Sequence, residues 1–226
     1  MIRTLISTGV SALLLAAAYA FLAMPVSSPG ETSLLPGAAM AQEAPAEDVD
    51  TSTIREMVMG AEDAPITMIE YASYTCPHCA AFAEGPFKEI KKNYIDTGKV
   101  KLIYREVYFD KFGLWASMIA RCAGPDRFFG VNELLYSTQR DWVQAGDTQA
   151  IVGELKKIGR MAGLDDAALE SCLQDGDKAR TLVAWFQENA EADDVTGTPT
   201  FIIDGEKVPN QPYSDFEKLF DAKLGE

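Results

Sequence analysis

Histidine, cysteine and positive charge are all scarce in this chain of 226 residues. Lys and Arg together number 20 against 34 Asp and Glu, so the net charge of −14 leaves no basic face for nucleic-acid phosphates. The one His lies inside the single C-x-x-C segment, and no second C-x-x-C or H-x-x-x-H pair is present to complete a tetrahedral zinc site. There is no internal repeat, and 47% hydrophobic residues exclude a disordered or collagen-like chain. We therefore expect one globular domain with protein or small-molecule partners.

The amino terminus is typical of an exported protein. Arg3 precedes an uncharged, mostly apolar segment that runs from residue 4 to residue 24. This is the pattern of a signal peptide, and an A-x-A cleavage site follows at residues 39–41. The apolar run of about 20 residues is also long enough for an uncleaved membrane anchor. Whether residues 1–41 are a signal peptide or an anchor, the rest of the protein is expected outside the cytoplasm.

The remaining chain divides into a leader and a domain. Residues 42–56 are rich in Ala, Pro and acidic residues without apolar periodicity, which predicts a flexible acidic leader before a domain at 57–226. The predicted elements are a strand at 66–71, a helix at 80–94, a strand at 100–109, a helical block at about 112–194, a hairpin at 200–208 and a final helix. Within the helical block, Thr148 and Asp165 are expected to cap helices.

Two cysteines, Cys76 and Cys79, lie at the first predicted strand-to-helix turn, in the segment CPHC. They can close a small disulfide, and the unpaired N–H groups of the first helical turn stabilise Cys76 as a thiolate. Pro77 suits the first helical position, and an imidazolium at His78 would lower the Cys76 pKa further and destabilise the disulfide. The pattern predicts a redox-active pair in which Cys76 is exposed and attacked and Cys79 is buried and resolving. The alternative is a purely structural disulfide.

Four features together resemble the DsbA family of thiol:disulfide oxidoreductases over about residues 57–226: CPHC, the apolar strand before it with Glu70, the long helical block, and GTPTF at 197–201. The resemblance implies an α/β, thioredoxin-like fold, with the helical domain inserted between the second strand and a cis-proline hairpin. It implies that Pro199 is cis and lies against the dithiol, and that the Thr198 backbone pairs with an extended substrate segment. The alternative is a trans Pro199 that opens an edge strand.

Glu70 is the candidate proton-relay residue. It lies six residues before Cys76, where the family has a buried acid beneath the dithiol. Burial would raise the pKa of this carboxyl group and allow it to exchange protons with Cys79, with Arg105 as a candidate charge partner. The alternative is a half-exposed Glu70 that faces solvent.

Cys122 and Cys172 lie on apolar faces of two predicted helices. In an oxidising compartment they most simply form a structural disulfide, which closes a loop of about 50 residues and stabilises the fold by about 4 kcal/mol. Two buried reduced thiols and a second redox pair are the alternatives.

We therefore expect a periplasmic, monomeric dithiol oxidase that needs no metal or organic cofactor. Its partners would be unfolded or reduced exported proteins and, by the resemblance, a DsbB-like quinone-linked membrane oxidase. A disulfide isomerase or reductase on the same fold is the first alternative, because threonine at position 198 resembles isomerase-type members; against it, the leader is too short to build an oligomerisation domain. A non-enzymatic chaperone or a copper(I)-binding module that uses Cys76 and Cys79 is the second alternative.

Overall fold

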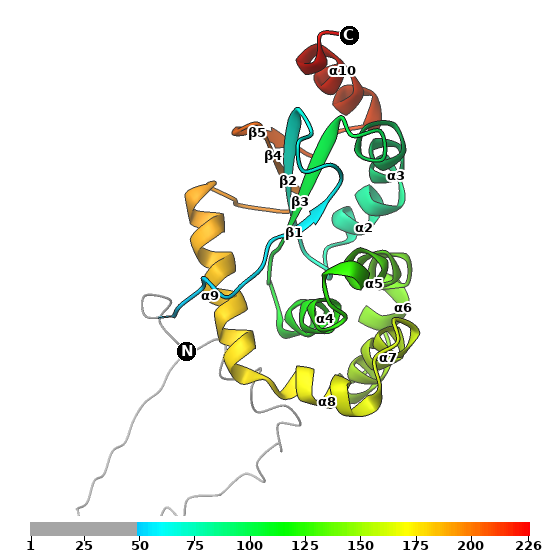
Figure 1. Ribbon diagram of the computed structural model, residues 1–226. Helices are drawn as coiled ribbons and strands as arrows, with labels where there is room; N and C mark the ends of the chain where they lie inside the picture. The colour runs from blue at the N-terminus through cyan, green and yellow to red at the C-terminus, as the bar shows by residue number, and fades with distance from the viewer. Residues whose placement is uncertain (1–48) are drawn as a thin grey trace, which may run out of the picture. The chain divides into compact units, whose positions relative to one another are not determined.

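The computed structural model describes residues 49–226, so the predicted signal peptide or anchor at 1–41 lies outside the described residues (Figure 1). In chain order the elements are β1 (Met57–Met59), β2 (Ile66–Ala72), α2 (Pro77–Glu84), α3 (Pro86–Ile90), the π-helical turn η2 (Lys91–Ile95), β3 (Val100–Glu106), α4 (Lys111–Cys122), α5 (Pro125–Ser137), α6 (Gln139–Val143), α7 (Thr148–Met161), α8 (Asp166–Gln174), α9 (Gly176–Ala192), β4 (Thr200–Ile203), β5 (Glu206–Pro209) and α10 (Tyr213–Leu224). None of these helices is long and apolar enough to span a bilayer.

The five strands form one mixed sheet in the order β1-β3-β2-β4-β5. The central strand β2 pairs parallel with β3 and antiparallel with β4. Because β2 and β3 are parallel, their carboxyl ends meet at one edge of the sheet. The loop after β2 and helix α2 follow from that edge, and the helices α4–α8 gather beyond it (Figure 1).

Helices cover both faces of the sheet. On one face, apolar side chains of β2, β3 and β4 pack against α2, α3 and α10, and the fully buried members include Met68, Leu102, Phe201, Phe82 and Phe216. On the other face, Tyr71 and Ile202 form a smaller cluster with Phe186 of α9. Side chains alternate along a strand, so β2 contributes to both layers.

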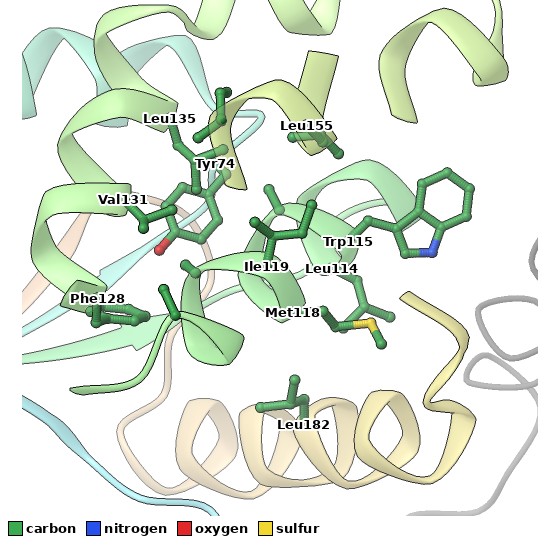
Figure 2. Packing of buried hydrophobic residues seen from close by; sticks show 14 of the residues in the cluster. Tyr74, Leu114, Trp115, Met118, Ile119, Phe128, Val131, Leu135, Leu155 and Leu182 are labelled. Atoms are coloured by element: carbon green, nitrogen blue, oxygen red, sulfur yellow. The ribbon is translucent and has the colours of Figure 1, made fainter. Parts of the chain in front are cut away.

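The six helices α4–α9 lie between β3 and β4 and have an apolar core of their own. Leu114 and Ile119 of α4 pack there with Leu155 of α7 and Leu182 of α9, and Tyr74 reaches the same cluster from the loop after β2 (Figure 2). Helix α7 comes so close to α4 and α8 that a Cβ atom at Gly159 would collide with the Leu169 side chain. Because Tyr74 belongs to this cluster, the insertion packs directly against the loop that leads to the dithiol.

A disulfide joins Cys122, at the end of α4, to Cys172 in α8, with their Cα atoms 6.3 Å apart. The expectation that both cysteines lie on apolar faces was wrong for Cys122, which is exposed. The buried part of α4 ends at Arg121, one residue before the cysteine. The bond thus joins two helices at the surface of the insertion.

The packed part of the chain includes residues that composition assigned to the leader. Ile54 is buried, and Glu56 forms an ion pair with Arg105 at 2.7 Å. The short edge strand β1 then pairs with β3. Three residues are too few to give a recognisable alternation, so this strand was not predicted.

Two local expectations were wrong. The helix predicted at 80–94 begins at Pro77 and is interrupted at Gly85, because Pro86 starts a new helix and restricts the residue before it. Asp147, rather than Thr148, caps α7 by accepting a hydrogen bond from the Ala150 N–H. The predicted cap at Asp165 is confirmed by its hydrogen bond from the Ala168 N–H.

Candidate active site

The dithiol lies where β2 passes into α2. Cys76 is the N-cap residue of α2 and Pro77 occupies the first turn, where a missing N–H costs no hydrogen bond. The Cys76 N–H donates to the Ser73 carbonyl at 3.1 Å and closes the turn between strand and helix. Both cysteines are free thiols here, with Cys76 half-buried and Cys79 fully buried. A partner thiol can therefore approach only Cys76.

The surroundings of Cys76 favour its thiolate. Its pKa is lowered from 9.0 to about 5, chiefly by the hydrogen bond from the Cys79 thiol and then by Thr198 and the backbone N–H groups of Cys79 and His78, with burial opposing them. His78 is exposed and contributes through its backbone N–H. The effect of the His78 ring on the Cys76 pKa stays a prediction.

Cys79 has the opposite environment. Burial raises the pKa of its thiol far above the ordinary value, and the neighbouring Cys76 raises it further. In the reduced pair, the negative charge therefore resides on Cys76 and the proton on Cys79. This is the asymmetry that thiol–disulfide exchange through one exposed sulfur requires.

The segment before β4 brings Thr198 and Pro199 to the dithiol. The Thr198–Pro199 peptide bond is cis, and Pro199 is buried. Antiparallel pairing of Tyr71 with Thr200 places this segment beside the end of β2. The Cys76 sulfur lies 3.5 Å from the Thr198 carbonyl oxygen, to which it donates when it carries its proton.

Glu70 is buried on the central strand, with 3% of its surface exposed. It pairs in register with Tyr104 of β3 and Phe201 of β4, and burial raises the pKa of its carboxyl group to about 8. Arg105 is not its charge partner, because side chains alternate along β3. Arg105 instead binds Glu56 and the Tyr71 hydroxyl on the other face of the sheet.

Polar residues that were not predicted hold the turn in place. The Thr75 hydroxyl donates to the Asp110 carboxylate at 2.7 Å, and Asp110 also caps α4. From α6, the Gln139 amide donates to the carbonyls of Tyr74 and Cys76. An Asp before an apolar helical run is a recognisable capping signal, but nothing in the sequence connects Gln139 to a turn more than 60 residues away.

The site thus brings together Cys76, Cys79, Thr198 and Pro199, with Glu70 on the strand that leads into the turn. Cys122 and Cys172 belong to the insertion instead. Within residues 49–226, no group of three or more His, Cys, Asp or Glu is arranged to hold a metal ion.

Known proteins share this architecture. Residues 52–222 match the family Thioredoxin_4, described as Thioredoxin. A Rickettsia bellii (strain RML369-C) protein whose name describes a protein-disulfide oxidoreductase is 31% identical over 172 residues, which are 76% of this chain and 65% of the relative. Disulfide bond formation protein D of Bacillus subtilis (strain 168) is 27% identical, with 72% of each chain covered. The chain therefore spans less than two thirds of the length of the Rickettsia relative.

A solved structure agrees with both the fold and the family. The crystal structure of α-DsbA1 from Wolbachia pipientis has a TM-score of 0.69 and 27% identity to this chain, and the match covers 76% of this chain and 92% of that one. This likeness confirms the predicted thioredoxin-like fold with an inserted helical region. With the family match over residues 52–222, it shows that the chain belongs to the DsbA-like, thioredoxin-family disulfide oxidoreductases.

Proposed function

We propose that the protein is an exported dithiol oxidase that passes a Cys76–Cys79 disulfide to reduced polypeptides. A substrate thiolate attacks the Cys76 sulfur, the bond to Cys79 breaks, and a mixed disulfide forms. A second substrate thiolate attacks the substrate sulfur of that bond and releases Cys76. Two electrons pass from the substrate thiols to the enzyme pair, Cys79 takes up one proton, and Cys76 leaves as the thiolate.

The observation that carries this proposal is the depressed pKa of Cys76. With a pKa of about 5, this sulfur is almost entirely thiolate at neutral pH. A thiolate stabilised in this way is a good leaving group, and its stability favours the reduced enzyme over the disulfide. A pair that prefers to be reduced oxidises its substrates.

Glu70 is proposed as the proton donor to Cys79. With its pKa raised to about 8, the buried carboxyl group is mostly protonated at pH 7 and has a proton to give when the Cys79 thiolate is released. The carboxylate can take the proton back when the pair is re-oxidised.

An exposed aromatic residue near the turn supports a polypeptide substrate. Phe109 keeps 60% of its surface exposed in the loop after β3, and the next residue, Asp110, binds Thr75 beside Cys76. We propose that this side chain contacts the unfolded chain of a substrate. The export pattern of residues 1–41 and the Cys122–Cys172 disulfide support action outside the cytoplasm, in the periplasm.

We further propose that the protein acts as a monomer and that a DsbB-like, quinone-linked membrane protein re-oxidises the pair. The support for this partner is the family resemblance at Cys76–Cys79 and Pro199.

Equilibration of the Cys76/Cys79 pair with glutathione tests the direction of the reaction. We expect a reduction potential well above that of thioredoxin, about −270 mV, and oxidative refolding of a reduced substrate protein in stoichiometric amounts. The Cys76→Ser variant is the control. It should form no Cys76–Cys79 disulfide with glutathione and should not refold the reduced substrate. A potential near that of thioredoxin would overturn the oxidase proposal.

Disulfide isomerisation is the second candidate function, and Thr198 is the observation that favours it. Threonine at this position resembles isomerase-type members of the family, and its side chain acts on the pKa of both cysteines. Reactivation of a substrate with scrambled disulfides by the reduced enzyme would favour isomerisation. Activity only from the oxidised enzyme on a fully reduced substrate would favour the oxidase.

A further inference from the structure

Gln139 connects the inserted helices to the backbone of the dithiol turn. It is the first residue of α6 and is 9% exposed. Its Nε2 donates to the Tyr74 carbonyl at 2.8 Å and to the Cys76 carbonyl at 2.9 Å. One side-chain amide thus binds the carbonyls on both sides of Thr75, including that of the reactive cysteine itself.

The bend between α5 and α6, which carries Gln139, is held by hydrogen bonds of the neighbouring residues. The Thr138 hydroxyl donates to the Leu134 carbonyl at 2.7 Å, where α5 gives way to α6. The indole of Trp142, which is 1% exposed, donates to the Leu135 carbonyl at 2.8 Å. These two hydrogen bonds, one buried and one part-buried, therefore fix the bend from which Gln139 reaches the turn.

The other side of the turn is also fixed. Thr75 donates to Asp110, which caps α4, and the Cys76 N–H donates to Ser73. Gln139 of α6 binds the carbonyls of Tyr74 and Cys76, and Asp110 at the start of α4 binds Thr75. Residues of α4 and α6 therefore hold the turn at and on both sides of Thr75. Both helices belong to the insertion, so the insertion sets the geometry of the dithiol.

We infer that Gln139 is a positioning residue for the dithiol, which holds the Cys76 carbonyl and thereby favours the Cys76 thiolate. The carbonyl belongs to the same residue as the sulfur, and its negative end disfavours a neighbouring negative charge. This oxygen already accepts a hydrogen bond from the Ala80 N–H at 3.2 Å. The N–H that Gln139 adds offsets a further part of its negative charge. This role applies in either direction of exchange and does not depend on the oxidase proposal.

Gln139→Met tests the inference, since methionine keeps the length of the side chain and removes both donors. We expect the Cys76 pKa, followed by thiolate absorbance or by the pH dependence of iodoacetamide labelling, to rise by up to about one unit. The equilibrium with glutathione should move up to about tenfold toward the disulfide, or about 30 mV. Gln144→Met, at an exposed position just after α6, is the matched control and should leave both values unchanged.

Thermal unfolding of each variant separates positioning from stability. A lower melting temperature with an unchanged Cys76 pKa and glutathione equilibrium would overturn the inference, because a purely structural residue would behave in that way. Should Gln139→Met fail to fold, Gln139→Glu keeps the shape and polarity but places a carboxylate against two carbonyls. It should raise the Cys76 pKa at least as much, and a wild-type pKa in that variant would also overturn the inference.

Discussion

At the scale of single residues, the thiols of Cys76 and Cys79 have pKa values shifted in opposite directions, although only two residues lie between them. Cys76 is half-buried at a helix N-terminus and receives hydrogen bonds from N–H groups and from the second thiol, whereas Cys79 is one turn further along and fully buried. The helix start explains both, because it exposes the N–H groups of the first turn and directs the next residues into the core.

The Cys76 pKa gives a direct prediction. In the reduced protein, absorbance of the thiolate at 240 nm should titrate with a midpoint of about 5, far below an ordinary thiol. Cys76→Ser should remove this transition, while Cys79→Ala should shift it upward because the main hydrogen-bond donor to the thiolate is lost. A midpoint near 8 in the wild type would contradict the assignment.

Glu70 predicts a pH dependence of stability. Its folded-state pKa of about 8 lies above its ordinary value of 4.5, so the folded state binds the proton more tightly than the unfolded state. The free energy of unfolding should therefore fall as the pH rises from about 4.5 to about 8, by a few kcal/mol in all. Glu70→Gln should abolish this decline and be more stable than the wild type at pH 8, as measured by urea unfolding at several pH values. Equal pH profiles for the two proteins would contradict the burial of an ionisable group at this position.

How well single residues can be predicted depends on whether their signal is local. CPHC, Glu70 and the Thr-Pro pair are each recognisable within a few neighbouring residues. Gln139 and Arg105 are not, because the first acts across more than 60 residues and the second is placed by strand alternation relative to a partner strand. Long-range hydrogen bonds of this kind become visible only when the fold is known.

At the scale of elements, a buried ion pair joins β3 to α4. The Arg121 guanidinium binds the Glu106 carboxylate at 2.6 Å, and both side chains are almost wholly inaccessible to solvent. Arg121 also donates to the Arg55 carbonyl, while Ser117 donates to Glu106. The pair thus connects the insertion both to the sheet and to the segment before β1.

Breaking this pair should be costly. Arg121→Met leaves the Glu106 carboxylate buried without its main partner and should lower the free energy of unfolding by about 3 to 5 kcal/mol. The double variant Arg121→Met, Glu106→Gln should recover much of that loss, because no unpaired charge remains. Urea unfolding of the three proteins provides the test, and a single variant as stable as the wild type would contradict it.

Strands that are short apolar runs between turn signals were predicted well. Strand ends that depend on pairing with a neighbouring strand were not. The strand at 66–71 and the first strand of the hairpin, at 200–203, agree closely with β2 and β4, because both are short apolar runs between turn signals. The strand predicted at 100–109 ends earlier, at Glu106. The apolar residues continue beyond Glu106, the last residue of β3 that pairs with β2. Apolar character alone therefore does not predict where the strand ends.

At the scale of the whole molecule, the Cys122–Cys172 disulfide closes a loop across the insertion, with a sequence separation of 50. Replacing both cysteines by Ser should lower the free energy of unfolding by up to about 4 kcal/mol, because the unfolded chain gains conformational entropy. The Cys76 pKa should not change, since the bond joins α4 to α8 and not the dithiol turn. Chemical denaturation and thiolate titration of the double variant check the two parts, and a shifted Cys76 pKa would show that the disulfide acts on the site.

The order of the strands also constrains how the protein can be made. Thr198 lies 122 residues after Cys76. During synthesis from the amino terminus, the dithiol is therefore made long before β4 can pair with the central strand β2. Cys122 and Cys172 emerge during that interval and are joined across helices that fold locally. Formation of their bond needs an oxidant, so under the proposed oxidase activity the chain is, during its own biogenesis, a substrate for the reaction that its finished dithiol carries out.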